Sequence, residues 1–167
     1  MNKKKKIILN FFLIIFFIVF NNKSFSKDLF EIEAKGVKYD NSKNLVIANG
    51  DAIASNKEGK KIKADQILYY KNKGLIITTG NSEYISASNN LQSKSFKYNI
   101  NSKKLNATGN VIFTDQNNNK FFFDELDFDE ISQQGKGLNI RVKTQDGSYL
   151  QSKKGEFNKK KKYYKII

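Results

Sequence analysis

Acidic side chains come closest, in type and spacing, to a reactive or metal-binding site in this chain. Five of them fall between positions 124 and 130, namely Asp124, Glu125, Asp127, Asp129 and Glu130. Clustered carboxylates can act as general acids and bases or bind a hard cation. Here they alternate with apolar residues, which is typical of the solvated face of a β-strand. The pattern therefore favours a structural role over a cation site.

Other sources of catalytic or metal chemistry are scarce. The chain has no histidine and no cysteine, so the commonest general base and the thiolate ligands are missing. Residues 115–119 resemble a calcium loop only in composition, because the glycine and closing glutamate of an EF-hand are absent. Gly50, Gly80 and Gly109 lie outside any phosphate-binding motif and suit tight backbone geometry. We expect no catalytic residue, no metal and no cofactor.

The chemistry that remains is the binding of apolar groups. A cassette of an apolar, a small, an apolar and an aromatic residue, at relative positions 0, +2, +5 and +7, recurs along the chain. Its anchors are spaced by 30, 29, 30 and 29 residues, and a fixed period of this length indicates a repeat architecture. The copies are Ile32/Ala34/Val37/Tyr39, Ile62/Ala64/Ile67/Tyr69, Leu91/Ser93/Phe96/Tyr98, Phe121/Phe123/Leu126/Phe128 and the weaker Leu150/Ser152/Gly155/Phe157.

The elements that must position these residues are β-strands. Each of the first three cassettes is followed by a turn and a second apolar strand, in which pairs such as Leu45 and Ile47 or Leu75 and Ile77 alternate with other residues. Side chains alternate between the two faces of a strand, so the three-residue step from +2 to +5 would place the two halves of a cassette on opposite faces. A bulge in every cassette would return both halves to one face, and we therefore predict one there. We expect an all-β fold of roughly 10 to 12 strands, an open antiparallel β-roll or jellyroll. A parallel β-helix is the alternative.

The ends of the chain differ from the repeat. Lysines at 3–6, an apolar run at 7–20 and small residues before position 27 predict a signal peptide over residues 1–26. An uncleaved anchor is the alternative, but about 14 apolar residues fall short of the roughly 20 that span a bilayer. We expect one domain over 27–158 and a basic tail over 159–167. Without the signal peptide the chain has 25 basic and 16 acidic residues.

Motifs in register with the repeat resemble a known family. They are the run from Ala64 to Tyr69, the pair Gly80-Asn81, and the run from Leu105 to Asp115 that contains Ala107-Thr108-Gly109-Asn110-Val111. This pattern is similar to that of the OstA-like periplasmic domains of lipopolysaccharide transport, over roughly residues 30–158. The family contains periplasmic bridge proteins and the N-terminal domains of outer-membrane assembly proteins. The sequence leaves both open.

The resemblance implies a β-jellyroll that is not an enzyme and that shields the acyl chains of lipid A in an apolar groove. It implies a periplasmic protein, with outer-membrane association left open. The implied partners are lipopolysaccharide, other jellyroll proteins of the transport bridge or of the assembly complex, and further copies of the chain stacked head to tail. An export signal argues against nucleic acid. Alternation suggests these groove residues: Ile32, Val37, Ile47, Ile62, Ile67, Leu75, Ile77, Phe96, Phe113, Phe121 and Phe123.

Two other function classes are compatible with parts of the sequence. A secreted structural or adhesive repeat protein would have the same strands but a solid core and no lipid ligand. An exported hydrolase would have to use the acidic cluster, and the lack of a nucleophile motif disfavours it.

Overall fold

The computed structural model describes residues 30–167 except 88, 116–117, 144–145 and 162, so the expected signal peptide lies outside the described residues. No helix in the described part is long and apolar enough to cross a membrane.

Thirteen strands build the described part, and every strand pairing is antiparallel. The expectation of an all-β antiparallel fold is confirmed, and the parallel β-helix is excluded. A short 3-10 helix, Lys71–Lys73, joins β4 to β5. Residues 163–166 of the expected tail form the last strand. The strands are β1 (Glu31–Glu33), β2 (Gly36–Asp40), β3 (Leu45–Ser55), β4 (Lys61–Tyr70), β5 (Leu75–Thr79), β6 (Ser82–Ser86), β7 (Asn89–Ser93), β8 (Ser95–Asn99), β9 (Lys104–Thr114), β10 (Lys120–Asp129), β11 (Gln134–Lys143), β12 (Tyr149–Asn158) and β13 (Tyr163–Ile166).

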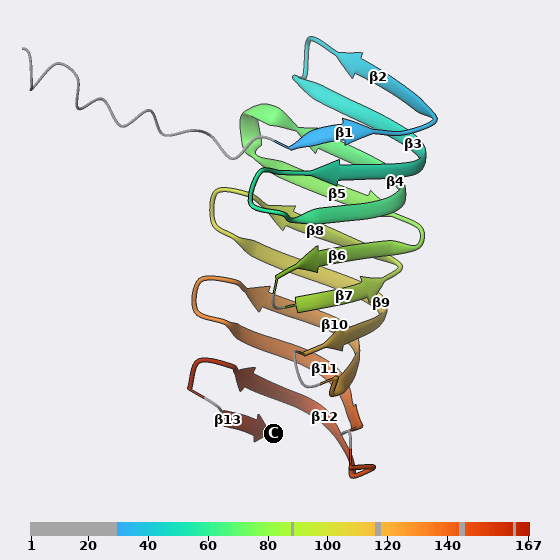
Figure 1. The fold of residues 1–167 in the computed structure, drawn as a ribbon. Helices are drawn as coiled ribbons and strands as arrows, with labels where there is room; N and C mark the ends of the chain where they lie inside the picture. Colours follow the sequence, from blue (N-terminus) through green and yellow to red (C-terminus); the bar gives the residue numbers. More distant parts are fainter. Residues whose placement is uncertain (1–29, 88, 116–117, 144–145, 162) are drawn as a thin grey trace, which may run out of the picture.

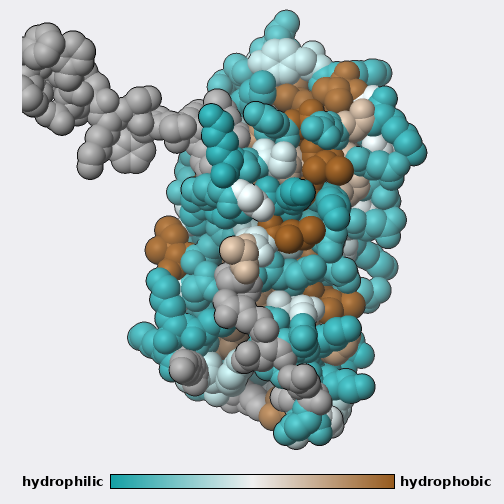
Figure 2. Space-filling view, in the orientation of Figure 1, coloured by the Kyte–Doolittle hydropathy of each residue, from teal (hydrophilic) through white to brown (hydrophobic). Residues whose placement is uncertain are grey.

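The single sheet folds over into two layers that face each other (Figure 1). Layer A contains β1, β6 and β7, and layer B contains β2, β5, β8 and β13. The long strands β3, β4, β9, β10, β11 and β12 run through both layers, because one half of each pairs in layer A and the other half in layer B. The face turned to the viewer in Figure 2 is largely hydrophilic, with separate hydrophobic areas.

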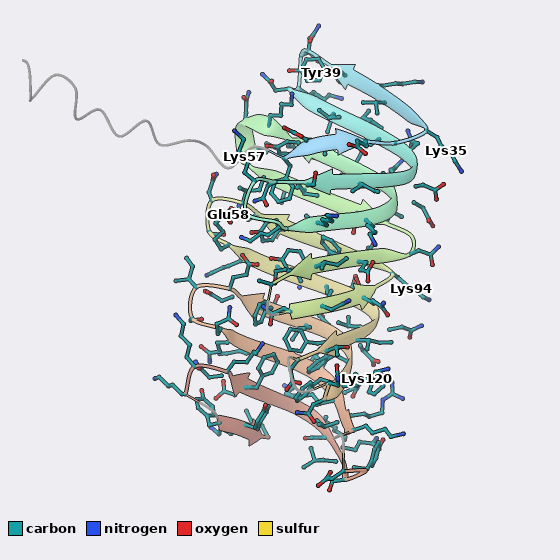
Figure 3. All side chains as sticks on the ribbon, in the orientation of Figure 1. Lys35, Tyr39, Lys57, Glu58, Lys94 and Lys120 are labelled. Carbon is teal, nitrogen blue, oxygen red and sulfur yellow. The ribbon has the colours of Figure 1, made fainter. Side chains whose placement is uncertain are left out.

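The strands bend along one side of the molecule, which we call the spine. Positive φ angles mark the bends at Gly50 and Asp51, at Gly80 and Asn81, and at Gly109 and Asn110. Glycine and Asn/Asp tolerate this left-handed backbone at low cost. Lys35 and Lys94 lie on the spine, whereas Lys57 and Glu58 lie on the opposite side (Figure 3).

The bulge predicted in each cassette is found at two of them, and in both the extra residue lies on the strand that pairs with the cassette. The pairing register shifts between Asn49 and Ala52, opposite the second cassette, and between Phe123 and Glu125 within the fourth. All four residues of the second, third and fourth cassettes are buried. One repeat of about 30 residues is therefore a pair of bent strands, and the bend keeps both halves of the cassette on the inner face.

The core lies between the two layers. Its largest fully buried side chains come from the cassettes and the strands beside them, and aromatic rings dominate its middle. Tyr84 packs against Tyr98 at 5.5 Å and against Phe96 at 6.4 Å between ring centroids. The middle of the interior is thus closely packed with side chains.

Candidate functional site

The structure divides the eleven predicted groove residues into three groups. Six are buried between the layers with at most 5% of their surface exposed, and the middle of the core holds four of them, Ile62, Ile67, Phe96 and Phe113. The other two buried residues, Phe121 and Phe123, line a cavity.

Three of the predicted residues lie on the outer surface of layer B. In β3 the neighbours of Ile47, Val46 and Ala48, both belong to the core, so Ile47 between them points away from it. In β5 the buried positions are Ile76 and Thr78, which places Leu75 and Ile77 on the outer face. The prediction that Ile47, Leu75 and Ile77 line the interior is therefore wrong. Large apolar residues occupy both faces of these strands, and alternation alone selected the wrong set.

Ile32 and Val37 belong to the edge strands β1 and β2 at the N-terminal end of the roll. Ile32 is half-buried and packs against the core. Val37 pairs with the buried Ala48, so its side chain points to the same inner face, yet 51% of its surface is exposed. Tyr39 points to the same face and is also exposed. Within the described residues, the inner face of layer B is therefore exposed at Val37 and Tyr39.

An apolar cavity of about 370 Å³ lies near the C-terminal end of the roll. Its walls come from β10, β11, β12 and β13, and most of its lining is aliphatic or aromatic. Leu150 and Tyr164 remain exposed at its margin. The lining residues are Asn119, Phe121, Phe123, Ile140, Val142, Ser148, Tyr149, Leu150, Glu156, Phe157, Tyr164 and Lys165.

Stacked rings and two glycines shape this cavity. Phe121 stacks on Phe157 at 5.8 Å and on Tyr164 at 5.7 Å between centroids. Gly135 and Gly137 of β11 lie under the rings of Phe157 and Phe123, which occupy the space that a β-carbon would need. A side chain at either glycine would push a ring into the cavity. The two glycines of β11 and the rings of the neighbouring strands therefore determine the shape of the cavity together.

Sequence reasoning missed most of the cavity lining. The signals were present, because Leu150 and Phe157 belong to the fifth cassette and Ile140 and Val142 alternate in β11. The weak match of the fifth cassette gave no reason to rank these residues above the core positions of the earlier repeats.

Lysines are concentrated in the last strands and turn of the chain. Between positions 149 and 167 the sequence has seven lysines and one acidic residue, Glu156. Glu156 pairs with Lys136 at 3.7 Å. Lys165 lines the cavity itself. An anionic group near the cavity margin would meet a net positive potential.

Two titratable groups beside the cavity are perturbed by burial. Burial lowers the pKa of Lys159, and the charge of Asp115 opposes this shift. The Lys159 ammonium lies 5.5 Å from the centre of the Phe113 ring. Burial also raises the pKa of the Tyr164 hydroxyl, and Asp115 acts in the same direction. Both groups border a region of low polarity.

The acidic cluster does not form a cation site in the structure. Asp124 and Asp127 are exposed, and Asn106 donates hydrogen bonds to Asp127 at 2.8 Å and to Glu125 at 3.2 Å. Glu130 lies in a turn and binds Lys60. Among the described residues no group of three or more acidic, histidine or cysteine side chains could hold a metal ion.

Comparison with known proteins agrees with this architecture. The structure is similar to the crystal structure of LptH from Pseudomonas aeruginosa, described as the LptA-homologous periplasmic component of the conserved lipopolysaccharide transport device. The TM-score is 0.59 and the identity 12%, over 72% of this chain and 86% of LptH, so this likeness shows the fold alone. No curated protein sequence matches the chain. The profile of the family described as "LptA/(LptD N-terminal domain) LPS transport protein" matches residues 31–148, more than half of the chain. The protein therefore belongs to the LptA/LptD N-terminal domain family of lipopolysaccharide transport proteins.

Proposed function

We propose that this protein is a periplasmic module that holds acyl chains of lipopolysaccharide between its two layers and transfers them along a row of stacked jellyroll domains. The C-terminal cavity is the acyl-chain site, and the lysines around it lie near the phosphate groups of the lipid. The predicted signal peptide supports export, and LptH, which has the same fold, is a periplasmic component.

The apolar cavity of about 370 Å³ is the observation that carries this proposal. Its volume is at the lower end of the range for ligand pockets, roughly 300–1,000 Å³. A cavity of this size accepts a segment of acyl chain. Each buried methylene contributes about 0.8 kcal/mol before the cost of ordering the chain. Lysines at the margin supply a complementary charge for phosphate.

Binding of purified lipopolysaccharide to two matched variants tests the proposal. Leu150 and Ile131 are both exposed aliphatic residues, but only Leu150 lines the cavity. We expect Leu150→Asp to weaken binding by about tenfold or more, because a carboxylate would be buried against the acyl chain. Ile131→Asp should bind like the unchanged protein. Equal loss or no loss in both variants would contradict a cavity-centred site, and absence of binding altogether would favour the structural repeat protein.

The stacking part of the proposal rests on the two ends of the roll. The edge strands β1 and β2 both pair with β3 alone, and residues 149–153 of β12 pair only with β11 in the described part of the chain. Such edges can accept a strand from another domain. Apolar inner-face residues are exposed at both ends, Val37 at one and Leu150 at the other. Sedimentation over a concentration series should show assembly of the unchanged protein and weaker assembly of Val37→Asp, and identical profiles would oppose it.

A further inference from the structure

The two layers are joined differently on the two sides of the molecule. At the spine the chain itself passes from layer to layer, and backbone hydrogen bonds such as Lys35 N–H to Gly50 O (3.0 Å) and Lys94 N–H to Gly109 O (2.8 Å) connect successive bends. The opposite side, where the turns of layer A meet the turns of layer B, we call the seam (Figure 1). Between described residues no backbone hydrogen bond crosses the seam.

The turns of layer B are instead bonded to one another along the seam. The Glu130 N–H donates to Lys103 O at 3.0 Å, and the Ile100 N–H donates to Gly74 O at 2.8 Å. These bonds continue the layer B ladder from turn to turn. Layer B is thus hydrogen-bonded up to its edge at the seam, and among the described residues its attachment to layer A there depends on side chains.

One cluster of side chains bridges the seam near its middle, and we call it the seam clasp. Lys60, from the turn between β3 and β4, donates to Glu130 Oε2 at 3.1 Å and to the Tyr98 hydroxyl at 3.3 Å. Tyr98 donates to the same Glu130 oxygen at 2.9 Å. Glu58 lies 3.1 Å from Lys60 and 3.8 Å from Lys103. Only 13% of the Lys60 side chain and 10% of the Glu130 side chain are exposed.

The clasp remains charged on the lysine side at neutral pH. Burial alone would lower the pKa of Lys60, but the electrostatic interactions with Tyr98 and the Glu130 carboxylate and the hydrogen bonds to Glu58 and Glu130 outweigh burial and raise it. Removing one partner of a buried, hydrogen-bonded ion pair leaves the other charge buried without compensation, which is destabilising.

A second contact closes the seam nearer the C-terminal end. Lys159, from the turn between β12 and β13, donates to Asn89 Oδ1 of β7 at 2.7 Å. Its ammonium lies over the Phe113 ring inside the roll. Polar side chains therefore cover the apolar interior at two heights along the seam.

We propose that the seam is the entrance through which acyl chains reach the interior, and that the seam clasp of Lys60, Glu130 and Tyr98 holds this entrance shut. The inference rests on the proposed lipid-binding function. The middle of the interior is filled by aromatic side chains, so a chain can occupy it only if the layers separate. Separation at the spine would break covalent and backbone connections, whereas separation at the seam breaks side-chain contacts.

The first test compares rates of lipid uptake in two glutamate variants of the full chain. The probe is cis-parinaric acid, a fluorescent fatty acid, followed by stopped-flow mixing. Glu130→Gln removes the negative charge of Glu130 at nearly unchanged side-chain shape. We expect association and dissociation both to become faster by roughly tenfold, with little change in Kd, because a gate alters the barrier and not the bound state. Glu83→Gln removes a comparable ion pair with Lys63 on the outer face and should leave both rates unchanged.

The second test fixes the seam shut. The chain has no cysteine, so Glu58→Cys together with Lys103→Cys creates a unique pair across the seam that a bismaleimide can join in the folded protein. The joined protein should take up the probe about tenfold more slowly or not at all. Each single variant, capped with a monomaleimide, loses a Glu58 contact but has no link between the layers, so it should take up the probe at least as fast as the unchanged protein.

The outcomes separate the two proposals. If the unchanged protein binds the probe but the joined protein takes it up equally fast, or if Glu130→Gln leaves both rates unchanged or changes only one of them and so shifts Kd, the seam is not the entrance and lipid binding stands. If the unchanged protein binds no probe, the proposed function fails and the entrance fails with it.

Discussion

At the residue scale, the cavity depends on positions where a side chain is missing as much as on those where one is present. Gly135 and Gly137 face the interior, and the rings of Phe157 and Phe123 lie against their backbones. Neither glycine has a positive φ, so backbone conformation does not explain them. Their role is to leave room for two rings that frame the cavity.

Replacing Gly137 by alanine should therefore destabilise the fold. The added methyl would overlap the Phe123 ring and the backbone near Glu125, and overpacking of this kind costs about 1–3 kcal/mol. The measurement is the free energy of unfolding in urea. Gly36→Ala is the matched control, because its β-carbon would meet nothing closer than 3.9 Å, and it should change stability by less than about 0.5 kcal/mol. Equal effects of the two substitutions would contradict the packing role of Gly137.

Glu83 on the outer face of layer A should make part of the stability dependent on pH. Burial would raise the pKa of Glu83, but hydrogen bonds from Lys63, Asn90 and Gln92 outweigh it and lower the pKa below the ordinary 4.5. A carboxyl whose pKa is lower in the folded state stabilises the fold above pH 4.5 and loses this contribution as the pH falls through the lowered value. Urea unfolding of Glu83→Gln should show a flatter fall in stability with acid than the unchanged protein. Parallel curves would refute the assignment.

At the element scale, the sequence was sufficient to identify the repeat. It was not sufficient to decide which face of each strand points to the core. The cassette and its odd step predict the bent strands correctly. The reason is that large aromatic side chains at fixed spacing are buried favourably only on the face that points to the core. In β3 and β5 apolar residues occur on both faces. The interior there takes the small Ala48 and Ala52, while Ile47, Leu68 and Ile77 lie side by side outside and shield one another across paired strands.

The C-terminal cavity was the part of the site that sequence alone could not give. It needs the register between β10, β11 and β12, which aligns Phe121 with Val142 and Val142 with Leu150. Register follows from the bends and turns together, and a one-residue slip would turn every side chain to the other face. The apolar residues can be identified from the sequence, but which of them lie in contact across neighbouring strands cannot.

The bends of the spine lead to a prediction about Asn110. Its φ of 52° lies in the left-handed region, which a β-branched residue avoids. Asn110→Val should destabilise the fold by about 1–3 kcal/mol. Asn110→Gly should be close to neutral, because glycine adopts this conformation freely. Thermal unfolding of the two variants decides the point, and a valine variant as stable as the glycine variant would refute a conformational role.

At the scale of the whole molecule, the roll combines a continuous spine, a seam held by side chains and two open ends. In the described part of the chain, apolar inner surface is exposed at β2 and again at the cavity beside β12. In a stack of such domains these surfaces would adjoin, and the closely packed middle would have to open to let an acyl chain pass. The central claim is therefore that lipid contacts the inner face of the layers and not their outer face.

Site-specific photo-crosslinking to lipopolysaccharide tests this claim most directly. The photoreactive residue benzoylphenylalanine is placed at Leu150, which lines the cavity, or at Ile77, on the outer face of layer B. Both variants are incubated with lipopolysaccharide, irradiated, and probed for the covalent adduct. We expect an adduct at Leu150 and none above background at Ile77. Adducts at Ile77 alone, or none at Leu150 in a folded variant, would contradict the binding of lipid between the layers.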